Sequence, residues 1–411
     1  MSSARPSSSL RRRLTPLGLI AGALLVAGCA QNAPQDTWDP AGENAQKIHD
    51  LQWPVFAIAG VVGVIVFVVV GIVVVKFRDR GQPIPEQSHG KPALEIALTI
   101  LPAMILIGVS IPTVGTLMAL AKTDDTECVV NVTGQQWWWE IDYPAQAGCG
   151  LDGGLEQAIV TSGQMVIPTG TNVLVRGTSR DVIHSWWIPR LNGKRDMVPG
   201  RVHTLRLQAD EPGIYAGQCA EFCGLSHANM RMEVVALDPP DFQRWIEMQL
   251  APVGEPTSEL GIAGQDVFRS QCASCHQQNG LLDANGDPML AQPELRVYSG
   301  AAPDLTHLMT RNTFAGASFD LITPECRNDV WEASPEEFGD RYLAGVTADC
   351  LNAVDLREWL RNPPEKKPMY ADALLLQPTD GLTRGMPYLA LSEEQIDQLI
   401  AYLLETTNGA D

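Results

Sequence analysis

Residues 55–75 constrain the fold of this chain more than any other segment, because they are almost wholly Val, Ile, Gly, Ala and Phe. About 20 apolar residues is the length that a helix needs to cross a bilayer. A second apolar stretch covers residues 94–120 and is interrupted by Pro102 and Pro112. The sequence therefore predicts a hairpin of two transmembrane helices over residues 55–120.

The charges around this hairpin predict its orientation. The connection between the two spans carries four cations, Lys76, Arg78, Arg80 and Lys91. Because cytoplasmic loops are enriched in Lys and Arg, we expect the connection in the cytoplasm and everything after residue 120 outside. The second span opens with a single acid, Glu95, which would be costly in or near the bilayer unless it serves a purpose.

The N-terminus has the layout of an export signal. Three arginines at 11–13 precede an apolar run over residues 14–27, which ends in Val-Ala-Gly-Cys29. This ending resembles a bacterial lipoprotein box, and it implies cleavage before Cys29 and lipidation of its sulfur. The alternative is an ordinary signal peptide in which Cys29 is incidental. We expect a signal peptide over residues 1–28, an extracytoplasmic segment over 29–54, and a location in the bacterial plasma membrane.

The net charge limits the class of partner. The formal net charge of the chain is −19, which argues against nucleic acid as a partner. A basic protein partner and a solvated acidic surface would both explain this charge.

Short β-branched segments of alternating polarity follow the hairpin and predict a cupredoxin-like antiparallel β-sandwich over residues 121–250. They lie at residues 128–133, 165–167, 172–177, 202–207 and 230–235. His184 is placed just after a strand, and residues 219–230 form a loop between two later strands. Single-copper sandwiches collect their ligands from one upstream His and one Cys/His/Met loop.

The 219–230 loop concentrates soft metal ligands, because it reads CAEFCGLSHANM. A mononuclear blue-copper site uses one Cys, whereas two thiolates can bridge a pair of copper ions. The predicted ligands of a two-copper centre are two bridging thiolates, two terminal imidazoles and two weak axial donors: Cys219, Cys223, His184, His227, Met230 and the backbone carbonyl of Glu221. The alternatives are a structural zinc ion in a Cys2His2 set and a disulfide between the two cysteines.

Residues 272–276 read CASCH, the C-x-x-C-H signature of covalent haem attachment. Cys272 and Cys275 would add to the haem vinyl groups, and His276 would be the proximal iron ligand. A Pro/Gly/polar linker at 251–260 precedes this motif, and a closing helix is expected over 392–405. We expect an all-α domain over residues 261–411, which resembles a class I cytochrome c.

The sixth iron ligand is expected to be a methionine downstream of the haem motif. Met386 is the first choice, because it stands in a Gly-Met-Pro sequence shortly before the closing helix. Met369 is the second choice, and the other two candidates are Met289 and Met309.

The stretch between the haem motif and Met386 is long for a cytochrome with a single haem. We attribute the excess to an insertion at about 312–354, which we expect to form a flap on the surface. In an oxidising compartment the four remaining cysteines are expected to form disulfides within each exported domain, Cys128 with Cys149 and Cys326 with Cys350. Sequence alone leaves other pairings open.

The hairpin and the sandwich together resemble cytochrome c oxidase subunit II. The similarity rests on EIALTILP at 95–102, GQQWWW at 134–139, PGR at 199–201 and the copper loop at 217–230. The resemblance implies that Trp137 is the aromatic residue where electrons enter, and that the Glu221 carboxylate reaches a magnesium ion shared with subunit I. It also implies that Glu95 stands at the entrance of a proton path. The family usually has Trp, His and Tyr at three positions that differ in this chain: Leu98, Gln135 and Trp138.

These resemblances imply subunit II of a haem–copper oxidase of caa3 type, with a cytochrome c fused to its C-terminus. Electrons from cytochrome c or a cytochrome bc complex would enter at haem c and pass through the two-copper centre. Subunit I would reduce oxygen to water with proton pumping, and subunit III would complete the complex. The alternative is a membrane-tethered electron carrier or redox sensor without an oxidase partner. A quinol-oxidase subunit II would have lost the copper ligands, and a nitrous oxide reductase would need a second, His-rich copper domain.

Overall fold

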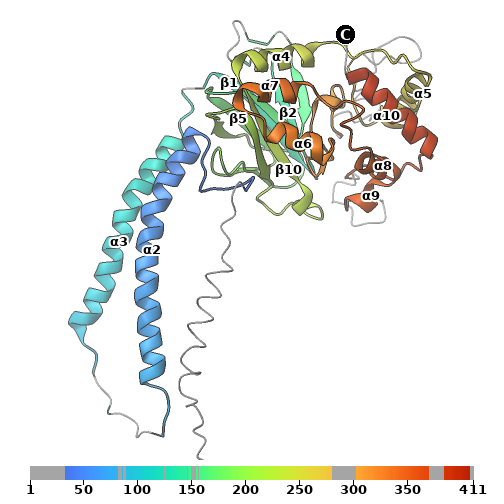
Figure 1. Ribbon diagram of the computed structural model, residues 1–411. Coiled ribbons are helices and arrows are strands. Elements are labelled where there is room, and N and C mark those ends of the chain that lie inside the picture. Colours follow the sequence, from blue (N-terminus) through green and yellow to red (C-terminus); the bar gives the residue numbers. More distant parts are fainter. Residues whose placement is uncertain are drawn as a thin grey trace, which may run out of the picture.

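The computed structural model describes residues 33–81, 86, 89–124, 126–145, 147–149, 154–155, 157–279, 302–369 and 384–407. A helical hairpin extends from two packed exported domains (Figure 1). The expected signal peptide, the lipidation candidate Cys29 and the methionine Met289 lie outside the described residues.

The hairpin consists of α2 (Glu43–Lys76) and α3 (Pro92–Leu120), which are both long and apolar enough to span a membrane. The apolar side chains of both spans are exposed, which suits helices surrounded by a bilayer. Helix α2 begins well before the predicted span, and its first turn is anchored on the sandwich. The Asn44 side chain donates to the Arg206 carbonyl at 3.0 Å and accepts from the Arg206 guanidinium at 3.0 Å. The first span is therefore tied directly to the exported sandwich.

The sandwich has two main sheets. The first has the order β3-β2-β1-β5-β8, formed by β3 (Ile159–Ser162), β2 (Trp138–Tyr143), β1 (Cys128–Gln135), β5 (Val173–Ser179) and β8 (His203–Leu207). The second has the order β4-β10-β9, formed by β4 (Gln164–Pro168), β10 (Arg231–Leu237) and β9 (Gly213–Gln218). A small ribbon joins β6 (His184–Trp186) to β7 (Arg195–Met197).

Strand direction differs from the expected antiparallel pairing in two places. Strand β1 pairs with β5 in parallel, and β10 pairs with β4 in parallel. Parallel neighbours need a long crossover connection. The chain supplies one by passing through β2, β3 and β4 before it returns to β5. The β-sandwich is therefore of mixed direction.

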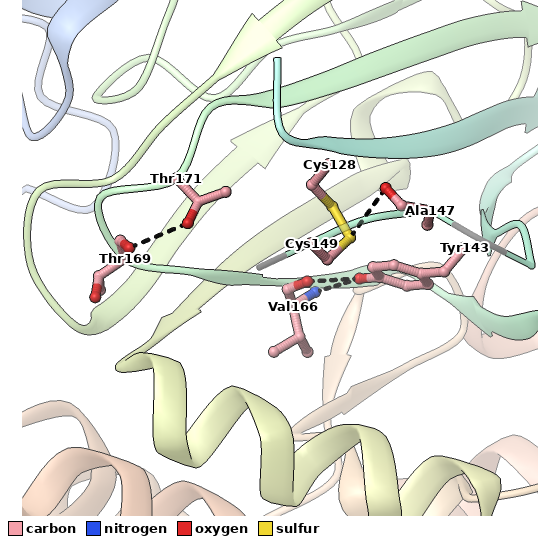
Figure 2. The surroundings of a disulfide bond; sticks show 7 residues. All are labelled: Cys128, Tyr143, Ala147, Cys149, Val166, Thr169 and Thr171. Carbon is pink, nitrogen blue, oxygen red and sulfur yellow. Dashed lines mark hydrogen bonds between the residues drawn. A yellow bond between two sulfur atoms is a disulfide. The ribbon is translucent and has the colours of Figure 1, made fainter. Parts of the chain in front are cut away.

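A buried tyrosine joins the two sheets (Figure 2). The Tyr143 hydroxyl on β2 donates to the Val166 carbonyl on β4 at 2.8 Å, and accepts from the Val166 amide at 2.7 Å. Nearby, the Cys128–Cys149 disulfide ties the start of β1 to the loop after β2. These links stabilise the sandwich.

Helix α4 (Pro239–Leu250) covers the sandwich with Phe242 and Trp245 and leads into the C-terminal domain. That domain contains α5 (Glu259–Val267), the π-helical turn η2 (Phe268–Cys272), α8 (Ala353–Arg361), α9 (Pro363–Lys366) and α10 (Glu393–Thr407). Helices α5 and α10 cross at Gly264, where a Cβ atom would lie 2.0 Å from the Gln398 carbonyl. Only glycine permits this close crossing of the first and last helices.

The 312–354 segment is not the surface flap that we expected. It forms the ribbon β11 (Thr313–Phe314) and β12 (Phe319–Asp320), and the helices α6 (Pro324–Trp331) and α7 (Pro335–Leu343). Phe338 and Tyr342 of α7 are buried in the core of the sandwich domain, whereas Leu321 and Ile322 are buried in the core of the C-terminal domain. Figure 1 shows α7 beside α4, over the strands. The segment therefore packs between the two domains, and its Cys326–Cys350 disulfide closes it.

Candidate metal centres

The loop between β9 and β10 is closed at its base by backbone hydrogen bonds. The Cys219 amide donates to the Met230 carbonyl at 2.9 Å, and the Ala220 amide donates to the Ser185 carbonyl at 3.0 Å. The second bond ties the loop to β6, the strand that begins with His184. The strand order of the fold thus brings a histidine that is distant in the sequence to a loop of two thiols.

The sulfur atoms form the centre of this site. The Sγ atoms of Cys219 and Cys223 are 3.8 Å apart. The Cys219 sulfur lies 4.0 Å from Nδ1 of His184, and the Cys223 sulfur lies 3.6 Å from Nδ1 of His227. Met230 places its Sδ atom 3.7 Å from the Cys223 sulfur. Each thiol therefore has one imidazole beside it.

The backbone carbonyl and the side-chain carboxylate of Glu221 lie in different surroundings. Its backbone carbonyl lies 3.2 Å from the Cys219 sulfur, within the ligand cluster. Its carboxylate side chain is exposed on the loop surface. The backbone and the carboxylate of this residue therefore face different surroundings.

His184 is held in one orientation by a carboxylate that the sequence analysis missed. Oδ1 of Asp181 lies 2.9 Å from Nε2 of His184, which leaves Nδ1 facing the thiols. Burial lowers the pKa of His184, but the hydrogen bonds with Asp181 and Cys219 outweigh it and raise the pKa overall. A carboxylate behind a ligating histidine fixes the tautomer and makes the ring a better donor. The spacing Asp-x-x-His was the available signal.

The two thiols titrate as a pair. A hydrogen bond from the Cys223 thiol lowers the pKa of Cys219, and His184 acts in the same direction. The thiolate that forms there raises the pKa of Cys223 in turn, with burial adding to the effect. A bound cation would allow both thiols to be deprotonated at once, because metal binding favours thiolates. Both sulfurs are buried, so the donor set fits soft, thiophilic metal ions.

The side chains beneath the loop include the expected aromatic residue. Trp137 lies between β1 and β2, and its indole N–H donates to the Cys223 carbonyl at 3.1 Å. The side-chain amide of Gln136 donates to the same carbonyl at 2.7 Å. Trp137 is thus in direct contact with the metal loop, but it is only 2% exposed.

The C-x-x-C-H motif follows the π-helical turn at the end of α5. Cys272 is buried and Cys275 is exposed. Nδ1 of His276 lies 2.8 Å from the Pro303 carbonyl, which leaves Nε2 for an iron ion. Burial lowers the pKa of His276, which favours the neutral imidazole that metals bind.

A buried arginine, which the sequence analysis missed, provides the second test of the haem interpretation. Arg311 is 4% exposed, and its Nε and Nη2 atoms have no hydrogen-bond partner among the described residues. Its charge lowers the pKa of His276, as does burial, which has the larger effect. Buried guanidinium donors without partners among the described residues fit an anionic group such as a haem carboxylate. The residues present therefore fit a covalently bound haem.

Two of the methionine candidates, Met369 and Met386, lie in segments that contact each other. Met369 is buried, and Met386 is half-buried against the cores of both domains. A Cβ atom on Gly385 would lie 2.5 Å from Sδ of Met369, so the segment that carries Met386 contacts Met369 directly. Met309 is fully buried within the C-terminal core.

Glu95 lies far from the metal loop. It is in the first turn of α3, an exposed helix start at the end of the hairpin away from the sandwich (Figure 1). The length of the hairpin therefore separates Glu95 from the other candidate residues.

Comparison with known proteins matches the architecture. The model of the cytochrome c oxidase subunit II periplasmic domain matches residues 128–237, and that of the transmembrane domain matches residues 30–115. Subunit 2 from Alkalihalophilus pseudofirmus is 36% identical over 70% of this chain and 83% of its own length. Subunit 2 from Bacillus sp. strain PS3 is 31% identical over 93% of this chain and 94% of its own.

One similar solved structure is the periplasmic domain of subunit II of cytochrome oxidase from Bradyrhizobium japonicum. It is 26% identical, covers 32% of this chain and 96% of its own, and has a TM-score of 0.27. The family models and the relatives agree on the same assignment. This chain belongs to the cytochrome c oxidase subunit II family, and it is a two-span membrane subunit of an oxidase complex with its sandwich domain outside the cytoplasm.

Proposed function

We propose that the CuA copper centre implied by the family is held by six donors of this chain: Cys219, Cys223, His184, His227, Met230 and the carbonyl of Glu221. The observation that carries this proposal is the 3.8 Å separation of the two sulfurs with one imidazole beside each. His184 and the two cysteines lie within 4.8 Å of one another, but His227 is not in that group. Two metal ions suit this elongated set better than one tetrahedral zinc ion.

We propose in addition that the C-terminal domain carries a haem c. Cys272 and Cys275 would bind it covalently, and His276 and Met386 would be its axial ligands. The 2.8 Å contact between His276 and Pro303 and the two unpartnered nitrogens of Arg311 support this proposal. The match to the relative from Bacillus strain PS3 covers 93% of this chain, so the similarity extends beyond the sandwich into this domain.

When bound, the haem and the copper pair act as one-electron carriers, so that electrons accepted at the haem continue through copper to subunit I, where oxygen is reduced to water and protons are pumped. Cytochrome c or a cytochrome bc complex is the proposed donor, and subunits I and III are the proposed partners. Trp137 contacts the copper loop, and Glu95 would stand at a proton entrance. The exposed Glu221 carboxylate would face magnesium at the subunit I interface. Cleavage after residue 28 and lipidation of Cys29 are also proposed.

Metal and haem stoichiometry of the detergent-purified complex tests this function. Wild type should contain two copper ions per chain beyond the copper of subunit I, one covalent haem, and a near-infrared copper band. Cys223→Ser should lose the copper pair and keep the haem. Cys275→Ser is the reciprocal control, because it should weaken haem attachment and keep the copper band.

Three outcomes would each overturn part of the proposal. Zinc in place of the copper pair would refute the copper assignment. A chain that purifies without haem-bearing partner subunits would favour the tethered electron carrier, and an absence of covalent haem would remove the donor half of the pathway.

A further inference from the structure

A lysine of the C-terminal domain is buried against the copper domain. Lys367 follows α9 and is 2% exposed. Its side-chain nitrogen lies 2.9 Å from the Trp137 carbonyl, 2.7 Å from the Ala315 carbonyl and 3.1 Å from the Ser318 hydroxyl. Lysine is rarely buried because its polar head must find partners away from water. Here all three partners belong to segments that meet at the metal loop.

The three segments come from different parts of the chain. Trp137 joins β1 to β2 in the copper domain, residues 315–318 form the turn between β11 and β12, and Lys367 belongs to the C-terminal domain. Without the lysine, the Trp137 and Ala315 carbonyls would each lose the donor that they share, and the Ser318 hydroxyl, 2.9 Å from the Ala315 carbonyl, does not link the two segments in its place. A buried carbonyl left without a partner costs about 1–3 kcal/mol. Lys367 therefore joins the segments instead of merely occupying a space between them.

Other contacts fix the same face of the copper loop. The Arg231 amide, at the end of this loop, donates to the Gly316 carbonyl at 3.1 Å. The Ser318 hydroxyl donates to the Asn229 carbonyl, and the Ser226 hydroxyl donates to the Pro368 carbonyl. The segments around Lys367 thus cover the second half of the copper loop and bury Trp137 beneath them.

The turn requires glycine at its closest approach. Gly316 has φ +71°, and a Cβ atom there would lie 2.5 Å from the Trp137 carbonyl and 3.1 Å from the nitrogen of Lys367. A side chain at this position would push the turn away from the carbonyl that Lys367 binds. This glycine provides a second, uncharged way to disturb the same contact.

We propose that Lys367 is a positioning residue for electron transfer between the two exported domains, holding the haem domain in one fixed position on the Trp137 side of the copper loop. This role rests on the proposed function, because it requires an electron carrier in each domain. The rate of transfer depends on a fixed separation of the carriers, and the contacts of Lys367 set that separation. The same cover keeps soluble donors away from Trp137, so that electrons enter through the haem domain.

The test is Lys367→Met in the complete oxidase, with Lys366→Met as the matched control. Lys366 has the same side chain and is the neighbouring residue, but it pairs with Asp355 and Glu358 inside the C-terminal domain. The first readout is the copper–haem distance distribution from pulsed dipolar electron paramagnetic resonance. The second is the haem-to-copper transfer rate after photochemical reduction of the haem.

Wild type and Lys366→Met should give one narrow distance distribution and the same rate. Lys367→Met should broaden the distribution and slow transfer about tenfold or more, because small misplacements of reacting centres have large effects on rate. The optical spectra of both centres should stay unchanged. An unchanged distribution in Lys367→Met, or a slower rate without a broader distribution, would overturn the positioning role.

Gly316→Ala keeps the proposal testable if Lys367→Met fails to fold. It should broaden the same distribution without changing any charge. Its control is Gly170→Ala, which has the similar backbone angle φ +69° but open space around the new methyl group. Equal distributions in the two alanine variants would overturn the proposal. A wild-type complex that lacks either paramagnetic centre would instead refute the proposed function itself.

Discussion

Arg384 of the C-terminal domain places its Nε atom 3.5 Å from Oδ2 of Asp181, whose other carboxylate oxygen lies 2.9 Å from His184. Gln136 donates its backbone amide to the same carboxylate at 2.8 Å. One buried acid thus connects a histidine at the metal loop to a cation two residues before Met386. Substitution of Asp181 should therefore affect the metal loop first, because its contact with His184 is shorter than its contact with Arg384.

Asp181→Asn should weaken copper binding about tenfold to a hundredfold, the usual effect of losing a carboxylate behind a ligating histidine. The amide can no longer hold a positively polarised imidazole in the same way, so Nδ1 of His184 is less firmly directed at the thiols. Competition with a copper chelator measures the affinity. Asp196→Asn, at an exposed position in β7, is the control and should bind copper as wild type does. Equal affinities in both variants would contradict the orienting role.

Met386→Ala should abolish the long-wavelength absorption band of methionine-ligated ferric haem, whereas Met369→Ala should keep it. The two side chains lie at the same place in the fold, so the pair controls for local packing. Optical spectra of the oxidised chain decide between them. Loss of the band in Met369→Ala alone would reverse the assignment of the sixth ligand.

His307 predicts a pH dependence of stability. It is 3% exposed, burial lowers its pKa below the ordinary value of 6.5, and its Nε2 atom lies 3.1 Å from the Ala251 carbonyl. Below pH 6.5 the unfolded state takes up a proton that the folded state does not, so stability falls as the pH drops, by up to about 1.4 kcal/mol per pH unit. His307→Gln should flatten this loss in thermal unfolding of the detergent-solubilised chain. A variant with the same slope as wild type would contradict this origin.

Tyr143→Phe should lower the free energy of unfolding by about 1–3 kcal/mol, since it leaves the buried amide and carbonyl of Val166 without their shared partner. Chemical denaturation followed by tryptophan fluorescence gives the value. Tyr388→Phe removes the same hydroxyl at a position that is 62% exposed, and it should have almost no effect. Similar losses in both variants would show that the bridge between the sheets adds little.

The sequence predicted those features that depend on local spacing. The apolar runs predicted the hairpin, and the loop at 219–230 contains five of the six candidate donors. The closing helix expected from residue 392 begins with a capping box, since Ser392 and Gln395 exchange hydrogen bonds of 3.0 and 3.2 Å. Such features can be predicted because the interacting groups are close in the sequence.

Features that depend on contacts between distant segments could not be predicted in this way. Periodicity shows that β1 and β5 are strands, but it does not show that they pair in parallel. Lys367 stands in a Lys-Lys pair that looks solvated, and only the folded chain shows that it reaches Trp137. The prediction of a surface flap considered only the excess length of the insertion. It overlooked the amphipathic helix α7, which buries Phe338 and Tyr342.

Because α7 is buried against the sandwich, the domain that folds as one unit is longer than the segment that the family model matches. The family model ends at residue 237, but the apolar core of that domain includes Phe338 and Tyr342. A fragment cut at the family boundary would expose aromatic surface to water and lose part of its own interior. During synthesis, the copper-binding sandwich is therefore incomplete until much of the following domain has left the ribosome and crossed the membrane.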